Sequence, residues 1–179
     1  VSTENIDELS DLINNQGIIA LVNITGGCYP SSFPQDHLFN KNQLILESIS
    51  NPGNLGNIMR TSDWFGLKAI YLSKDSIDPY NSKVVRSAMG AHFYLDIIEI
   101  DITKHIIDLK KNNFTIIAAD IVGENIYDWN PPDKWAIILG NEAHGISDKI
   151  RKLVDCTITI PKQGNIESLN VSMAAGILL

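Results

Sequence analysis

The sequence predicts an α/β protein built on an open parallel sheet with helices on both faces. Short apolar segments alternate with segments of helical periodicity from residue 44 to the end of the chain. Two expected strands, 116–119 and 136–139, are apolar at every position, which is typical of a parallel sheet buried on both sides. Ligands of such sheets bind beyond the carboxyl ends of the strands, so the segments that follow the strands are the candidate sites.

The first forty residues predict a separate region. Apolar residues at helical spacing predict a helix at 6–15, which the polar run Asn-Asn-Gln-Gly at 14–17 would end. An apolar strand is expected at 17–22. The segment after it is rich in glycine, proline and serine, so we expect a linker that extends to about Asn40.

The remaining elements form one alternating series. The expected strands, each a short apolar run, are 44–49, 69–72, 94–100, 114–119, 135–139 and 156–160. The expected helices are 55–65, 82–89, 104–112, 147–153 and a last one that begins near Leu169. The face of the first helix that should pack on the sheet comprises Leu55, Ile58, Met59, Ser62 and Phe65.

Length and composition fit one ordinary domain of 179 residues, 44% hydrophobic and 20% charged. We expect no membrane span, because no apolar run approaches ~20 residues, and no secretory leader, because no charged-then-apolar leader is present. The cysteine usage favours a cytoplasmic, reduced protein. The two cysteines, Cys28 and Cys156, form neither a metal-binding nor a disulfide pattern. The net charge of −7 argues against a nucleic-acid partner, since phosphate contacts require Lys and Arg.

Three polar segments follow expected strands. In the first, 51–61, Pro52 and Gly53 should form a tight turn and Asn54 the N-cap of the next helix. Arg60 lies off the apolar face of that helix, so a surface arginine is the simpler interpretation. The glycine spacing here does not fit a dinucleotide-binding loop.

The second segment, 139–145, leaves a buried strand directly. Gly140 would let a ligand approach the backbone, and Glu142 lies where a carboxylate could orient an arginine or a hydroxyl, although a solvated polar turn explains it equally well. The third segment is 160–172. Ser168 or Asn170 could simply cap the last helix, and the glycine and amide groups also suit a small polar ligand.

In this order and at these separations, the three segments resemble the signature motifs of SpoU/TrmH-type RNA 2′-O-ribose methyltransferases, within the SPOUT superfamily. The resemblance covers about residues 43–179. The matching positions are Asn54, Gly56, Arg60 and Thr61 in the first motif, Gly140, Glu142 and Gly145 in the second, and Ser168 to Ser172 in the third. Ser87, Ala88, Gly90 and Ala91 also resemble the corresponding segment of these enzymes.

The resemblance implies a deep trefoil knot in the C-terminal part of the sheet, which holds S-adenosylmethionine, and a homodimer whose sites are completed across the interface. The methyl group would pass to a ribose 2′-hydroxyl of tRNA or rRNA, leaving S-adenosylhomocysteine, and no metal would be required. The cofactor contacts implied by motif position are Leu139, Gly140, Asn141, Ile160 and Leu169.

The catalytic residues implied by the resemblance are Arg60, Asn54, Glu142, Ser168 and Asn170. Arg60 would either take the proton of the 2′-hydroxyl or stabilise the developing alkoxide, and the other four would position Arg60 and the nucleotide. A base role for Arg60 needs special surroundings, because arginine is almost always protonated.

The resemblance also implies a domain organisation. Residues 1–40 would be the remnant of an N-terminal RNA-binding domain of the L30e type with its linker, and 41–179 the SPOUT methyltransferase domain. The rest of the N-terminal domain would carry much of the positive charge that this acidic chain lacks. Lys83 and Arg86 are either RNA phosphate contacts or solvated helix residues.

Three other interpretations compete with ribose methylation. The first is a base-methylating enzyme of the same superfamily, for example one acting on guanine N1, and the second is a non-catalytic RNA-binding or assembly module with the same fold. The third is a nicotinamide oxidoreductase, against which the missing glycine fingerprint counts. The pairs Asn54/Arg60 and Ser168/Asn170 favour ribose over base methylation, and the complete set of five polar residues argues against a non-catalytic module. The sequence does not identify the RNA.

Overall fold

The computed structural model describes residues 19, 20, 22 and 42–179. The helix predicted at 6–15, the linker up to Asn40 and the L30e-like remnant lie outside the described residues. The strand predicted at 17–22 lies mostly outside them, and residues 19, 20 and 22 belong to no helix or strand.

The described chain forms a six-stranded parallel sheet with the order β3-β2-β1-β5-β4-β6. The strands are β1 (Gln43–Leu46), β2 (Ala69–Ser73), β3 (Asp96–Ile100), β4 (Thr115–Asn125), β5 (Trp135–Leu139) and β6 (Cys156–Thr159). The helices are α3 (Pro52–Trp64), α4 (Ser82–Ala88), the 3-10 helix η1 (Ala91–Phe93), α5 (Ile102–Lys111), α6 (Asp148–Arg151) and α7 (Val171–Leu178).

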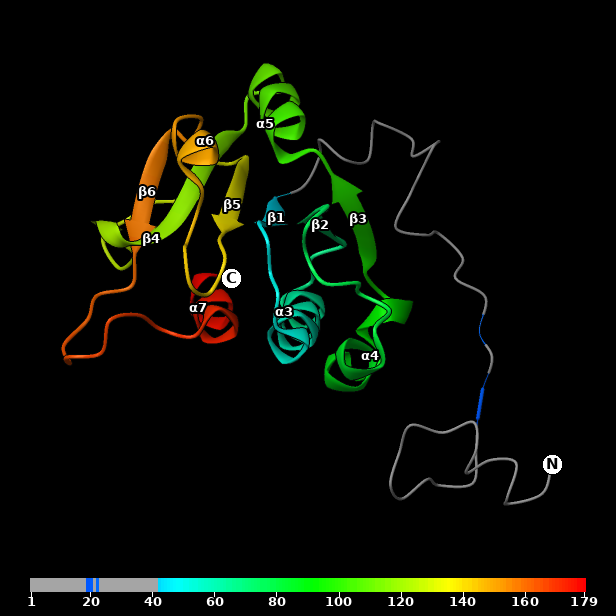
Figure 1. Cartoon of the computed structure of the whole chain (residues 1–179). Coiled ribbons are helices and arrows are strands. Elements are labelled where there is room, and N and C mark those ends of the chain that lie inside the picture. Colours follow the sequence, from blue (N-terminus) through cyan, green and yellow to red (C-terminus); the bar gives the residue numbers. More distant parts are fainter. Residues whose placement is uncertain (1–18, 21, 23–41) are drawn as a thin grey trace.

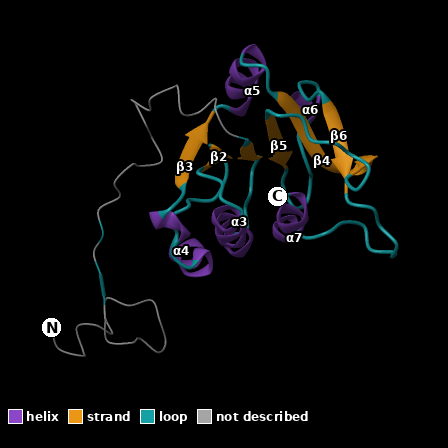
Figure 2. Ribbon diagram, turned by 180° about the vertical axis from the view of Figure 1, so that it is seen from behind, coloured by secondary structure: helices purple, strands orange, loops and turns teal. Residues whose placement is uncertain are grey.

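Helices cover both faces of the sheet, as predicted. Helices α3, α4 and α7 lie on one face, and α5 and α6 lie on the other (Figures 1 and 2). Each layer has its own apolar core: Leu55 and Ala175 pack against one side of the strands, while Ile106 and Ile150 pack against the other. The apolar strands are therefore buried from both sides, which is why they carry few polar residues.

Strand β4 is longer than the predicted 114–119, because it continues past a bulge. Its register against β6 shifts between Ala119 and Glu124, which both face Ile158. Gly123 lies in the bulge, where an added β-carbon would come within 2.5 Å of the carbonyl oxygen of Thr157. The strand predicted at 94–100 instead begins at Asp96, since η1 precedes it, and the one predicted at 44–49 ends at Leu46.

The start of α3 differs from the prediction. Asn51, not Asn54, is the N-cap, and its side-chain oxygen accepts hydrogen bonds from the amides of Gly53 (2.9 Å) and Asn54 (3.1 Å). Pro52 begins the helix, where a missing N–H costs nothing. At the other end Phe65 is 49% exposed, so it does not belong to the packed face, whose other four predicted members are buried.

The remaining helix boundaries differ by a few residues. Helix α4 ends one residue before Met89, which adopts a left-handed backbone with a φ of 51°. Helix α5 begins at Ile102, and α6 is confined to Asp148–Arg151. Helix α7 begins at Val171 rather than near Leu169, because Asn170 is its N-cap.

We expect Gly56→Ala to destabilise the protein by about 1–3 kcal/mol, because α3 and α4 approach too closely at this point for a side chain. A β-carbon at Gly56 would lie 1.9 Å from the Oγ of Ser87 and 2.8 Å from the amide nitrogen of Ala88. Urea unfolding measures the effect, with Gly164→Ala as control, since no atom lies within 4 Å of that position. Equal stability of both variants would contradict the close contact.

The buried ring of His105 should make the stability of the fold depend on pH. Its ring stacks on Tyr71 at 4.6 Å between centroids, and its Nε2 shares a 2.7 Å hydrogen bond with the side chain of Gln43. Burial lowers the pKa of His105 from 6.5 to about 4, although the nearby carboxylate of Asp108 acts to raise it.

Between these two pH values, His105 binds a proton in the unfolded chain but not in the folded chain. The free energy of unfolding therefore falls as the pH decreases from 6.5 towards 4. His105→Gln should flatten the dependence of the unfolding free energy on pH over this interval. The matched change at exposed His144 should leave the dependence as in the parent chain. An unaltered slope in His105→Gln would show that other groups cause it.

Candidate active site

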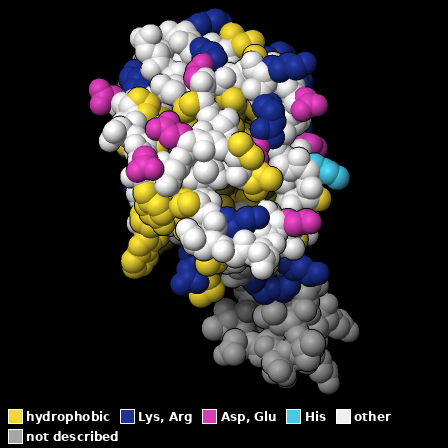
Figure 3. All heavy atoms as spheres, turned by 90° about the vertical axis from the view of Figure 1, so that its left-hand side faces the viewer, with side chains coloured by type: hydrophobic (Ala, Val, Ile, Leu, Met, Phe, Trp, Pro, Cys, Tyr) yellow, Lys and Arg dark blue, Asp and Glu magenta, His cyan; other side chains and the backbone are white. Residues whose placement is uncertain are grey.

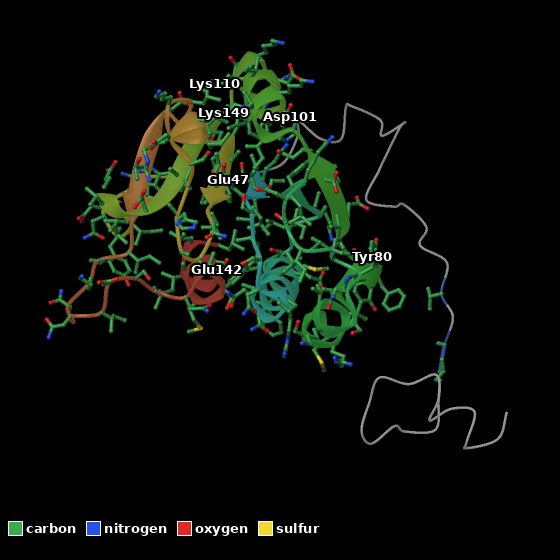
Figure 4. The ribbon with its side chains drawn as sticks, in the orientation of Figure 1. Glu47, Tyr80, Asp101, Lys110, Glu142 and Lys149 are labelled. Atoms are coloured by element: carbon green, nitrogen blue, oxygen red, sulfur yellow. The ribbon has the colours of Figure 1, made fainter. Side chains whose placement is uncertain are left out.

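The carboxylate of Glu142 lies at the carboxyl edge of the sheet, three residues after β5 ends, beside the start of α3 (Figure 4). It accepts hydrogen bonds from the side-chain nitrogen of Asn54 (2.9 Å), the hydroxyl of Ser50 (3.2 Å) and the amide of Asn51 (3.3 Å). A fourth, longer bond comes from the amide of Ser50 at 3.5 Å. The segment after β5 is thereby joined to the segment after β1.

Asn54 continues this connection to the third segment. Its side-chain oxygen accepts a 3.0 Å hydrogen bond from the side-chain nitrogen of Asn170. The oxygen of Asn170 then caps α7, accepting from the amide (2.9 Å) and the hydroxyl (2.7 Å) of Ser172. Each asparagine has one donor and one acceptor end, and an ionised carboxylate only accepts, so Glu142 fixes the orientation of both amides in turn.

The surroundings of Glu142 favour its charged form. Partial burial raises the pKa of Glu142, but the hydrogen bonds from Asn54, from its own amide and from the amides of Asn51 and Ser50 together lower it below its ordinary value. The N-terminus of α3 also presents the positive end of a helix dipole to this carboxylate. Glu142 is therefore an anion at neutral pH, suited to orienting hydrogen-bond donors.

A tight turn holds Glu142 in place. The backbones of Asn141 and Gly145 exchange two hydrogen bonds, of 3.0 and 2.8 Å, and the side-chain oxygen of Asn141 accepts from the amides of Ala143 and His144. An added β-carbon at Gly140 would lie 2.2 Å from the backbone carbon of Gly145. Glycine is therefore needed at position 140 because two backbone segments cross there. This is a different reason from the close approach of a ligand that the sequence suggested.

The other predicted site residues are not joined to this network. Arg60 is exposed on α3 and forms no hydrogen bond or ion pair with any described residue. It follows Asn54 by six residues, which places it on a different side of the helix. Ser168 is also exposed and lies just before Asn170.

The expected cofactor contacts lie at the end of β5 and in the segments after β5 and β6. Leu139 is buried at the end of β5, Ile160 is half-buried just after β6, and Leu169 is 43% exposed just before α7. The remaining two, Gly140 and Asn141, belong to the tight turn. All five thus lie at the carboxyl end of a strand or in the segment that follows it, where a parallel sheet places its ligands.

Two residues of this network, Ser50 and Asn51, were not predicted as site residues, although they contribute three of the four hydrogen bonds to Glu142. A signal for Asn51 was present, since an asparagine directly before a proline is a typical start of a helix. The capping role that the sequence offered as a simple explanation for Asn170 is confirmed, and it coexists with the bond to Asn54.

Within the described ranges, no group of three or more His, Cys, Asp or Glu side chains has an arrangement that could hold a metal ion. No helix formed by the same described residues has the length and apolar character needed to cross a membrane.

The family model described as "SpoU rRNA Methylase family" matches residues 41–179. The chain belongs to this family. It is 36% identical over 138 residues to the 23S rRNA (guanosine-2′-O-)-methyltransferase RlmB of Neisseria meningitidis. It is 32% identical over 137 residues to the 23S rRNA (guanosine(2553)-2′-O)-methyltransferase RlmP of Bacillus subtilis. Each alignment covers 76% of this chain and 55% of the relative, so the chain spans little more than half the length of these proteins.

Solved structures agree with this assignment. A putative RNA methyltransferase of the TrmH family from Porphyromonas gingivalis superposes with a TM-score of 0.74 at 30% identity, covering 78% of this chain and 57% of the other. The SpoU methyltransferase AviRb from Streptomyces viridochromogenes, in complex with AdoMet, gives a TM-score of 0.69 at 27% identity, covering 77% and 57%. The described fold is thus that of SpoU/TrmH structures.

We expect Glu142→Gln to weaken the protein more at about pH 7 than at about pH 3. A carboxyl whose pKa is lowered by folding stabilises the folded state above its ordinary value of 4.5, and this contribution is lost as the pH falls through the lowered pKa. The glutamine also turns an N–H donor towards backbone amides that are donors themselves.

Urea midpoints of the parent chain and of Glu142→Gln, measured across this pH range, test the expectation. Glu167→Gln, an exposed change in the third segment, is the matched control. A stability difference that is the same at every pH would mean that the charge of Glu142 does not contribute.

Proposed function

We propose that this chain is the catalytic part of an S-adenosylmethionine-dependent enzyme that methylates a ribose 2′-hydroxyl of RNA. The observation that carries the proposal is the hydrogen-bonded series Glu142–Asn54–Asn170, which joins all three motif segments at the carboxyl edge of the sheet. A non-catalytic module would have no need for such a polar connection. Relatives named as 23S rRNA 2′-O-methyltransferases support ribosomal RNA as a substrate, with tRNA as the alternative.

The segments after β5 and β6 would hold S-adenosylmethionine, chiefly through backbone groups of Leu139, Gly140, Asn141, Ile160 and Leu169. Two exposed apolar side chains, Ile166 (67%) and Leu169 (43%), could pack on the flat aromatic face of the cofactor's adenine, and the space around Gly164 is open. When bound, the cofactor supplies a sulfonium methyl group that is already activated by its positive charge. A structural relative with bound AdoMet supports this assignment.

We propose that the C-terminal segments are threaded as a deep trefoil knot. The chain crosses from β5 to β6 past β4, and α7 then returns beneath the sheet beside α3 (Figure 1). Residues of α7 pack in the same core as Leu46 and Leu139, at the ends of the two central strands. The return of the chain from β6 to α7, beside the β5–β6 connection, supports the proposal of a knot.

Arg60 would complete the site of a second copy of the chain. Within one copy it is exposed and forms no hydrogen bond or ion pair with Glu142, Asn54 or Asn170. Helix α7 lies beside the same part of α3, and Met173 and Ile177 on it are 60% and 44% exposed. Exposed apolar side chains also lie between charged ones on the side that carries β6 and the segment leading to α7 (Figure 3). A homodimer would cover apolar surface and bring Arg60 to a partner's nucleotide.

In the reaction, the chain must align a weak nucleophile with the methyl group and ease the loss of its proton. We propose that the guanidinium of Arg60 stabilises the alkoxide that develops on the 2′-oxygen, because a fixed positive charge needs no change of protonation. The bond from the 2′-oxygen to the methyl carbon would form as the bond from sulfur to that carbon breaks, and the hydroxyl proton would pass to water. Asn54, Asn170 and Ser168 would position the nucleotide, with Glu142 fixing the two amides. No step requires a metal.

The proposal extends to the whole chain. Residues 1–40 would be the remnant of an L30e-like RNA-binding domain with its linker, and 41–179 the methyltransferase domain. Bacterial rRNA methyltransferases among the relatives support a cytoplasmic location.

We expect Arg60→Ala to lower the rate of methyl transfer from labelled S-adenosylmethionine to ribosomal RNA at least ~100-fold, because a charge at the reacting oxygen is lost. Binding of S-adenosylhomocysteine, measured by calorimetry, should change little. Lys104→Ala on α5, on the opposite face of the sheet, is the matched control and should keep the parent rate.

Full methylation by Arg60→Ala would overturn the role of Arg60. A folded parent chain that binds neither S-adenosylhomocysteine nor NADH, the ligand of the oxidoreductase alternative, would favour a non-catalytic RNA-binding module instead.

A further inference from the structure

Ser48 has an unusual backbone for its residue type. It lies two residues after β1 with a φ of 56°, in the left-handed region that serine rarely occupies. Non-glycine residues persist in this region only where their surroundings enforce it, and they are frequent at functional sites. The chain bends here between the buried strand and the segment that contacts Glu142.

All three polar groups of Ser48 are bound by residues distant in the sequence, which lie at the end of β2, in the loop after β2 and in the turn after β5. Its amide donates to the hydroxyl of Ser73 at 2.7 Å, and its hydroxyl donates to the carboxylate of Asp75. Its carbonyl accepts a 2.8 Å bond from the side chain of Asn141. The bond from Ser48 is also the main reason that the pKa of Asp75 lies below its ordinary value, so Asp75 is charged at neutral pH.

The residue after Ser48 is held by the same loop. The amide of Ile49 donates to the hydroxyl of Ser76 at 3.2 Å, and the carbonyl of Ile49 accepts from the amide of Ile77 at 2.8 Å. The hydroxyls of Ser76 and Ser73 are 3.1 Å apart and share a hydrogen bond. The path of the chain out of β1 is thus set by the loop after β2, which contains none of the three motif segments.

From this point the chain reaches the site within three residues. Ser50 and Asn51 donate to Glu142, and Asn51 is the N-cap of α3. The side chain of Asn141 donates to the carbonyl of Ser48, and Asn141 directly precedes Glu142 in the chain. Ser48 therefore positions both the donors and the acceptor of the contact with Glu142. A different backbone at Ser48 would turn the donors of Ser50 and Asn51 away from the carboxylate.

We propose that Ser48 and Asp75 are positioning residues of this site: Asp75 holds Ser48 in its left-handed conformation, and this conformation places the start of α3 against Glu142. The consequence for methyl transfer rests on the proposed function, but the placement of Glu142 does not. Neither residue would touch RNA or cofactor, and both would act through Ser50, Asn51 and Glu142.

The test compares four variants of the full chain: Ser48→Val, Ser48→Gly, Asp75→Ala and the double variant Ser48→Gly/Asp75→Ala. Valine strongly disfavours a positive φ, whereas glycine accepts it without the hydroxyl. Asp78→Asn, in the same loop, is the matched control, because an asparagine oxygen there can still accept from the amide of Tyr80.

The first readout is the pKa of Glu142, measured by carbon NMR titration of labelled glutamate and assigned with Glu142→Gln. We expect this pKa to rise towards its ordinary value in Ser48→Val and Asp75→Ala, and less in Ser48→Gly. Asp75→Ala should add no further rise in the Ser48→Gly background, since the hydroxyl through which it acts is gone. A merely structural role would lower stability without moving the pKa of this one residue.

The second readout is methyl transfer. A misplaced site should lower kcat about 10- to 100-fold in Ser48→Val and Asp75→Ala, with little change in KM for RNA. A Glu142 pKa that stays at the parent value in folded Ser48→Val would overturn the proposal. If the parent chain methylates no RNA yet the pKa moves as expected, the proposed function fails and the positioning role stands.

Discussion

The arrangement of the three motif segments depends on the carboxylate of Glu142, because it is the one group in the network that can only accept hydrogen bonds. Its charge forces the amide of Asn54 into one of two orientations, and Asn54 does the same to Asn170. Asn54 lies in the first turn of α3 and Asn170 caps α7. The negative charge of Glu142 therefore orients one asparagine at the start of each of these two helices. A polar chain of this kind is stable only when every member is satisfied.

Much of the fold was predictable, because a strand buried on both faces must be apolar throughout, as in 116–119 and 136–139. The three segments were also found from sequence, through their resemblance to known motifs. The helix cap was predicted at Asn54, which was wrong, although the proline after Asn51 favours a helix start there. The contact of Asn54 with Glu142 joins residues far apart in the chain, so the local sequence does not show it. The bulge in β4 and the bend at Ser48 likewise depend on partners distant in the chain.

The acidity of the chain, which argued against a nucleic-acid partner, is unevenly distributed. The stretch 52–95, which forms α3, α4 and η1, carries five Lys or Arg residues against three carboxylates, although the whole chain has a net charge of −7. Helix α4 has two cations, Lys83 and Arg86, and no acidic residue. Binding of a polyanion depends on the local field more than on the total charge, so the face that presents Arg60 remains compatible with RNA.

The hydrogen bonds of the Glu142 network join residues 88 and 116 positions apart in the chain. Contacts between such distant residues form late in folding, because a long loop must be closed before they contribute any stability. During synthesis, the first half of the sheet would be complete while Asn170 was still inside the ribosome. The site is therefore absent from any nascent chain from which α7 has not yet emerged, and it assembles only when this helix docks beside α3.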